Sequence, residues 1–160
     1  MRLKENGDAG IEELSEIRLV GFRVLCEGGQ YINEIPKAVS QLKERLDEIQ
    51  HITDFSVYYG AFIIDDYSNE EDGYWIAVQV SEYTNIPKGM LSLTIPPQRY
   101  AVKKFTGAND KIRDAYRSLH NWIEENGFER NLADWHLERY YGWSNKENLR
   151  VDLLDTIKKP

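Results

Sequence analysis

The stretch Trp135-His136-Leu137-Glu138-Arg139-Tyr140-Tyr141 sets one acid among aromatic and β-favouring side chains, which predicts an extended strand. Alternate side chains of a strand face opposite sides of its sheet, so His136, Glu138 and Tyr140 share one face. This face is too polar for a core. A carboxylate beside aromatic rings suits a flat, apolar and cationic ligand, so we interpret it as a binding face.

The composition is that of an ordinary globular domain of 160 residues, with a formal net charge of −7 and a pI near 5.0. An acidic chain lacks the clustered Lys and Arg of a nucleic-acid surface, so we expect no direct nucleic-acid binding. Cys26 is the only cysteine, which favours a reducing compartment. The polar start of the chain and the absence of a long apolar run predict a cytoplasmic protein with no membrane partner.

One order of elements, strand–glycine–helix–strand–turn–strand, occurs twice at a separation of about eighty residues. The two copies span about 15–80 and 98–158 and are joined by a Pro-rich linker, 81–97. Residues 1–14 are expected to form an N-terminal extension or a first edge segment. We therefore predict one α+β domain of two pseudo-symmetric βαββ modules, whose concave antiparallel sheet has both helices packed on one face.

Apolar periodicity and breakers set the expected element ends. Pro36 is placed in the first turn of the first helix, and Asn109 is expected to cap the second. The expected strands are 17–25, 55–64, 74–80, 99–105, 135–141 and 149–157, and the expected helices are 34–49 and about 110–126.

Side-chain alternation also predicts which residues of the first module face the helix. Tyr74 and Tyr59 are expected to face it, and Tyr58 is expected to point outward beside Trp75. Each module would then leave one sheet face bare, and the two bare faces would line a shared groove. In that groove Tyr58 would correspond to Glu138, and Phe55 to Trp135.

Four stretches together resemble the GyrI-like small-molecule-binding domain, found in the gyrase-inhibitory protein and in effector-binding domains of AraC-type and MerR-type multidrug regulators. The stretches are Ile95-Pro96-Pro97-Gln98-Arg99-Tyr100-Ala101-Val102, Phe105-Thr106-Gly107, Leu119-His120-Asn121-Trp122-Ile123 and Leu137-Glu138-Arg139-Tyr140. The resemblance covers about residues 15–158. In that family the acid of the last stretch contacts cationic aromatic ligands, and Glu138 matches it.

The resemblance implies a stand-alone form, because no helix-turn-helix fits before residue 15, and DNA binding would need a separate chain. Binding of small aromatic or amphipathic molecules, cationic ones included, is the first expectation. Some stand-alone relatives hydrolyse cyclopropane-bearing electrophiles, and the gyrase-inhibitory protein acts on another protein, so both functions stay open. A separate protein partner or a homodimer also stays open.

The candidate ligand-binding residues combine the acid with the rings that alternation and the repeat place near it. If the protein is a hydrolase, Glu138 would activate water, and Tyr58 or Tyr140 would donate a proton. The alternative is that Glu138 is a surface acid and the rings fill the core. No histidine or cysteine spacing suggests a metal, and no motif suggests a cofactor. The candidates are Glu138, Tyr58, Trp75, Tyr140, His136, Trp135 and Phe55.

Overall fold

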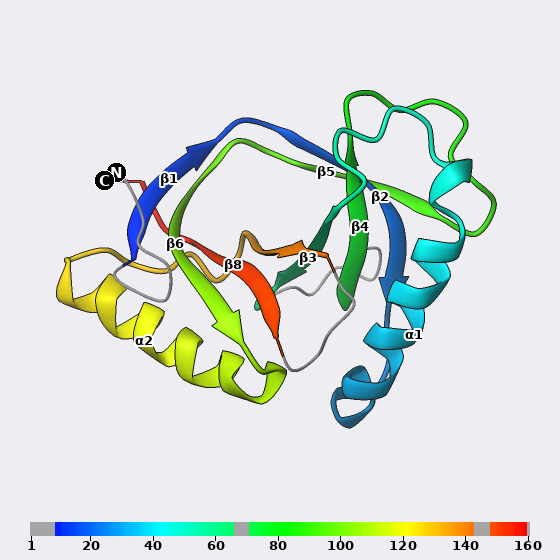
Figure 1. The fold of residues 1–160 in the computed structure, drawn as a ribbon. Coiled ribbons are helices and arrows are strands. Elements are labelled where there is room, and N and C mark those ends of the chain that lie inside the picture. The colour runs from blue at the N-terminus through cyan, green and yellow to red at the C-terminus, as the bar shows by residue number, and fades with distance from the viewer. Residues whose placement is uncertain (1–8, 66–70, 143–147, 160) are drawn as a thin grey trace.

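The computed structural model describes residues 9–65, 71–142 and 148–159. This part of the chain forms one antiparallel sheet with the strand order β1-β6-β8-β7-β3-β4-β2-β5, together with two α-helices (Figure 1). The strands are β1 (Gly10–Leu14), β2 (Ile17–Val24), β3 (Val57–Ile63), β4 (Tyr74–Val80), β5 (Leu91–Ile95), β6 (Gln98–Gly107), β7 (Trp135–Tyr141) and β8 (Leu149–Thr156). The helices are α1 (Tyr31–Glu44) and α2 (Ile112–Glu125).

Two βαββ modules build this sheet, as the repeat predicts. The first consists of β2, α1, β3 and β4, and the second of β6, α2, β7 and β8. The modules join at the centre, where β3 pairs antiparallel with β7 from Val57–Tyr141 to Ile63–Trp135. Each helix packs on its own module, and one apolar cluster contains residues of both helices. The α+β class and the helices on one face are therefore confirmed.

The strand before each module pairs with the first strand of the other module. β1 pairs with β6, and β5 pairs with β2, in registers that continue one another from Leu14–Gln98 to Ile17–Ile95. In Figure 1 the continuous runs β1–β2 and β5–β6 arch across the top of the view, with α2 at the lower left and α1 at the right. Part of the expected extension and part of the expected linker thus belong to the sheet, while residues 1–8 lie outside the described residues.

The face without helices is not bare, and the expectation that it lines a groove is wrong. It is filled by a second cluster of buried residues that includes Leu19, Trp75, Ile95, Tyr100 and Trp135. Because β1–β2 and β5–β6 arch across this side, the curled sheet buries its own second face. The central strands carry apolar side chains on both faces, and both sets are buried. The helices cover one face, and the arching strands cover the other.

The expected helix ends need small corrections. α1 begins at Tyr31, so Pro36 lies beyond the first turn, inside the helix. A short 3₁₀ turn at Asn109–Lys111 precedes α2. The N-cap residue of α2 is Lys111, which makes no side-chain cap hydrogen bond. Asn109 therefore does not cap α2. Tight 3₁₀ turns at helix starts are common, and they shift the boundary that a capping residue predicts.

Candidate functional site

Glu138 is buried at the centre of the helix-bearing face, with 8% of its surface exposed. The Tyr74 hydroxyl donates a hydrogen bond to Oε1 at 2.6 Å, and the Tyr116 hydroxyl donates one to Oε2 at 2.5 Å. Tyr140 donates a longer bond to Oε1, at 3.3 Å. The three donors come from β4, α2 and β7, so both modules hold this carboxylate.

No basic side chain among the described residues forms an ion pair with Glu138, whereas Asp152 and Asp155 each pair with an arginine. Burying a carboxylate without a countercharge is costly, and hydrogen bonds from neutral hydroxyls offset only part of that cost. The tyrosines register the same environment: burial, and then the nearby charge of Glu138, raise the pKa of Tyr74, Tyr116 and Tyr140 well above the usual value.

Gly60 gives Tyr74 its route to the acid. Gly60 pairs directly with Glu138, and each is the fourth of seven residues in its central strand. A Cβ at Gly60 would lie 1.7 Å from the Tyr74 hydroxyl oxygen, so only glycine lets this phenol cross β3. The repeat thus places a glycine opposite the acid, and the predicted equivalence of Tyr58 with Glu138 is off by two residues.

An apolar cavity of about 320 Å³ lies between α1 and the strands β3 and β4. Tyr31 and Ile35 of α1 line one side, and Phe62 and Tyr74 line the other. The Phe62 and Tyr74 rings stack with their centroids 6.0 Å apart. Tyr74 therefore has two roles. Its ring lines the cavity, and its hydroxyl donates a hydrogen bond to the carboxylate of Glu138.

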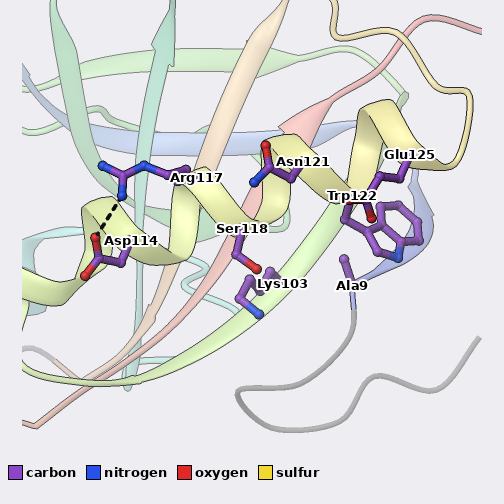
Figure 2. Close-up of a pocket in the computed structure, with 8 residues that line it drawn as sticks. All are labelled: Ala9, Lys103, Asp114, Arg117, Ser118, Asn121, Trp122 and Glu125. Atoms are coloured by element: carbon purple, nitrogen blue, oxygen red, sulfur yellow. Dashed lines mark ion pairs between the residues drawn. The ribbon is translucent and has the colours of Figure 1, made fainter.

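A larger cavity, of about 430 Å³, borders α2 away from this site (Figure 2). Figure 2 shows Ser118 of α2 pointing toward Lys103, and Trp122 of α2 lying near Ala9. Its lining mixes two acids with two basic groups, and Arg117 and Asp114 pair at 3.6 Å. Such a lining favours neither sign of ligand charge, and it contains none of the residues around Glu138.

The structure brings three other sequence-predicted residues to the face of Glu138. Tyr58 pairs with Tyr140 in register, and both side chains are buried in the helix-face cluster. His136 lies two residues before Glu138 and is also buried. Tyr58 was predicted to point away from the helices, and this is wrong, because its side chain packs in the helix-face cluster. It shares a face with Glu138 because Glu138 also lies on the helix-bearing face.

Trp75 and Trp135 lie on the opposite face, in the cluster under the arch. Ala61 pairs with Trp75, so alternation places Tyr59 rather than Tyr58 on the side of Trp75. The predicted phase of β3 was therefore shifted by one residue, which reverses every side chain of the strand. Phe55 precedes β3 and is 60% exposed, so it also lies apart from the acid.

Sequence reasoning missed Tyr74, Tyr116 and Phe62 as neighbours of the site. Tyr74 was correctly expected to face the helix, but only as a packing residue. A tyrosine in an apolar stripe carries a hydroxyl that needs a partner when buried, and this requirement was the available signal. Both hydroxyls find that partner in Glu138.

A second polar cluster surrounds Asp155 on β8, which is fully buried. Its carboxylate oxygens lie 2.8 Å from Nδ1 of His136 and 2.8 Å from Nε2 of His120, and Arg130 donates from Nε at 3.0 Å. Burial alone would raise the pKa of Asp155, but the contacts with His120 and His136 and the charge of Arg130 hold it well below the usual value. Asp155 is therefore a compensated acid.

These features define a class: duplicated βαββ domains with both helices on one sheet face and a buried acid between the modules. The chain belongs to the family of the GyrI-like small molecule binding domain, whose model matches residues 9–154. The resemblance seen in the sequence is thereby confirmed. A comparison with curated protein sequences finds no match.

Solved structures with the same fold cover nearly the whole chain. SAV2435 bound to tetraphenylphosphonium has a TM-score of 0.70 at 15% identity, covering 95% of this chain and 94% of that one. The EcmrR C-terminal domain has a TM-score of 0.66 at 19% identity, covering 96% and 98%. Within an EcmrR–DNA complex, this chain matches 58% of the EcmrR chain, with a TM-score of 0.68 at 19% identity. At these identities the similarity establishes the fold.

Proposed function

We propose that this domain binds amphipathic aromatic cations, with Glu138 as their countercharge. The observation that carries the proposal is a buried carboxylate held by three neutral hydroxyls, with no cationic partner among the described residues. A bound cation would supply the missing charge in a poorly solvated site. Each well-placed aromatic ring would add cation–π attraction of about 0.5–2 kcal/mol.

The cavity beside α1 supplies a route for the apolar part of such a ligand. Tyr31, Ile35 and Phe62 offer apolar and aromatic surface, and the lining also includes Tyr74 and the acid Asp72. A ligand that displaces the Tyr74 hydroxyl reaches Glu138 across the backbone of Gly60, where no side chain stands in the way. Losing a hydrogen bond to a charged group costs about 1.5–3 kcal/mol, which the new cation–carboxylate contact must exceed.

The comparison with SAV2435 supports this ligand class, because tetraphenylphosphonium is an aromatic cation. It is also a convenient probe, since it cannot donate a hydrogen bond and its charge does not change with pH. The shared fold is why we extend this ligand class to the present chain.

Isothermal titration with tetraphenylphosphonium tests the proposal. We expect saturable binding to the wild-type protein, and weaker binding to Phe62→Ala and Ile35→Ala, which remove cavity surface. Asn121→Ala is the matched control, because Asn121 lines the other cavity and should leave the affinity unchanged. Absence of saturable binding to the folded wild-type protein contradicts the proposal.

We also propose a cellular setting for this domain. No helix among the described residues is long and apolar enough to cross a bilayer. With a net charge of −7 we expect the domain to reach DNA only through a partner chain. Its single cysteine supports a reducing compartment such as the cytoplasm. A gel shift of random duplex DNA by this chain alone, at low salt, would contradict that expectation.

A further inference from the structure

His136 carries a buried ring nitrogen that the contacts around Glu138 leave unused. The residue is 2% exposed, and its Nε2 atom has no hydrogen-bond partner within the described parts of the chain. Leaving such an atom without a partner is unfavourable, and most buried polar side-chain atoms in folded proteins are bonded. An unpaired buried nitrogen beside a candidate ligand site therefore needs an explanation.

Asp155 fixes the orientation of this ring. Nδ1 of His136 lies 2.8 Å from Oδ1 of Asp155, which in turn is held by Arg130 and His120. A carboxylate can only accept a hydrogen bond, so Nδ1 carries the proton. In the neutral ring Nε2 then keeps its lone pair and acts as an acceptor. The two nitrogens flank Cε1 and their in-plane bonding directions diverge widely, so Nε2 is directed away from Asp155.

The side away from β8 is the side of β3, and Phe62 of that strand separates His136 from the cavity that it lines. His136 pairs in register with Phe62, and the two rings stack with centroids 5.5 Å apart and planes inclined by 13°. Phe62 also stacks on Tyr74 and lines the cavity. A row of flat rings thus runs through Tyr74, Phe62 and His136 and ends at Asp155. The last ring of the row, His136, lies two residues before Glu138 on β7.

We propose that His136 is a second recognition point of this site, whose Nε2 accepts a hydrogen bond from an N–H or O–H group of the ligand. Asp155 acts as its positioning residue. The inference deepens the proposed function and rests on it. His136 and Glu138 are two residues apart on one face of β7, so their Cα atoms lie about 7 Å apart. The preferred ligand is therefore an aromatic cation with a donor group a similar distance from its charge.

Three related phosphonium ions test the proposal on the wild-type protein. One is tetraphenylphosphonium, and the other two carry a para-hydroxymethyl or a para-methoxymethyl group on one ring. Only the hydroxymethyl compound can donate a hydrogen bond, and none of the three changes charge near neutral pH. We expect the hydroxymethyl compound to bind about tenfold more tightly than the methoxymethyl compound, because it gains one neutral hydrogen bond.

The variant His136→Phe removes the acceptor and keeps a flat ring against Phe62. We expect it to abolish the difference between the two substituted compounds. Tyr83→Phe, which removes a hydroxyl bonded to Thr94 far along the chain, is the control. If His136→Phe fails to fold, ¹⁵N NMR of the wild-type ring replaces it: Nε2 should shift upfield with the hydroxymethyl compound only.

The outcomes separate the two proposals. Equal affinity of wild type for both substituted compounds, with no Nε2 shift, overturns the role of His136 and leaves cation binding at Glu138 intact. A preference for the hydroxymethyl compound that persists in His136→Phe also overturns it. Failure of all three phosphonium ions to bind overturns the proposed function and, with it, this inference.

Discussion

Two buried acids on neighbouring strands show opposite ways of accommodating a negative charge. Asp155 on β8 is surrounded by Arg130, His120 and His136, all within 3.0 Å of its oxygens. Glu138 on β7 is held by three tyrosine hydroxyls, with no ion pair among the described residues. The first arrangement is internally balanced and needs nothing further. The second is stable enough to fold, yet it would gain from a cation.

Asp152 supports this distinction on the opposite face of β8. Arg139 donates to Asp152 at 2.9 Å, and the Tyr141 hydroxyl adds a bond at 2.6 Å. Among the residues that the structure describes, arginines therefore pair with two of the three buried acids. Glu138 differs from both, and that difference is why we assign it a binding role and the others structural or positioning roles.

The largest expected effect is on stability, and it falls on the balanced acid. Asp155→Asn removes the carboxylate charge and leaves Arg130 uncompensated, so we expect the unfolding free energy to drop by about 3 kcal/mol. Glu138→Gln is the comparison, because its amide oxygen can still accept from the tyrosines, and it should cost about 1 kcal/mol or less. Urea unfolding of both variants decides. Equal losses would remove the distinction between the two acids.

The next effect concerns the space that lets Tyr74 reach the acid. Gly60→Ala adds a Cβ where the Tyr74 hydroxyl now lies, so Tyr74 must move and its bond to Glu138 is lost. We expect a loss of about 2 kcal/mol in unfolding free energy. Gly28→Ala is the control, since its Cβ would meet no heavy atom within 4 Å. A Gly60→Ala protein as stable as Gly28→Ala would show that Tyr74 does not need this route.

A smaller effect is expected when Tyr74 loses only its hydroxyl. Tyr74→Phe removes a competitor for Glu138, so tetraphenylphosphonium should bind severalfold more tightly, while stability falls by about 1.5 kcal/mol. Calorimetric titration and thermal melting measure the two quantities on the same sample. Weaker binding than wild type would mean that Tyr74 contacts the ligand directly and does not compete with it.

The smallest effect is a pH dependence. The folded-state pKa of Tyr116 is raised above its unfolded value of about 10, so the folded state holds this proton more tightly. The associated stability is fully present below pH 10 and is lost as pH rises toward the folded pKa. We expect Tyr116→Phe to lose stability less steeply than wild type above pH 10. Parallel curves from denaturant titrations at successive pH values would contradict this.

Much of the architecture could be predicted from the sequence. The limits of β4 and β7 were read correctly, because each is a β-rich run bounded by turn residues. β5 was missed because the prolines around Leu91–Ile95 outweighed its alternation of buried Leu93 and Ile95 with exposed Ser92 and Thr94. A strand that pairs with a segment some seventy residues earlier leaves little local signal.

The candidate site was predicted in part. Glu138 stood out because one acid among rings departs from a core pattern. The phase of β3 could not be fixed, because Tyr58 and Tyr59 are identical residues and only the pairing with β4 decides which one faces the helices. The cluster at Asp155 was also hidden, since it brings together His120, Arg130 and His136 from α2, the following loop and β7.

The most direct test of the role of Glu138 compares two ions of the same shape and opposite charge, tetraphenylphosphonium and tetraphenylborate. Wild type should bind the cation at least about a hundredfold more tightly than the anion, because the anion would face a buried carboxylate. Glu138→Gln should weaken cation binding by about 2–3 kcal/mol and remove most of the preference. A Glu138→Gln protein that keeps the wild-type preference for the cation would contradict the assignment of Glu138 as the countercharge.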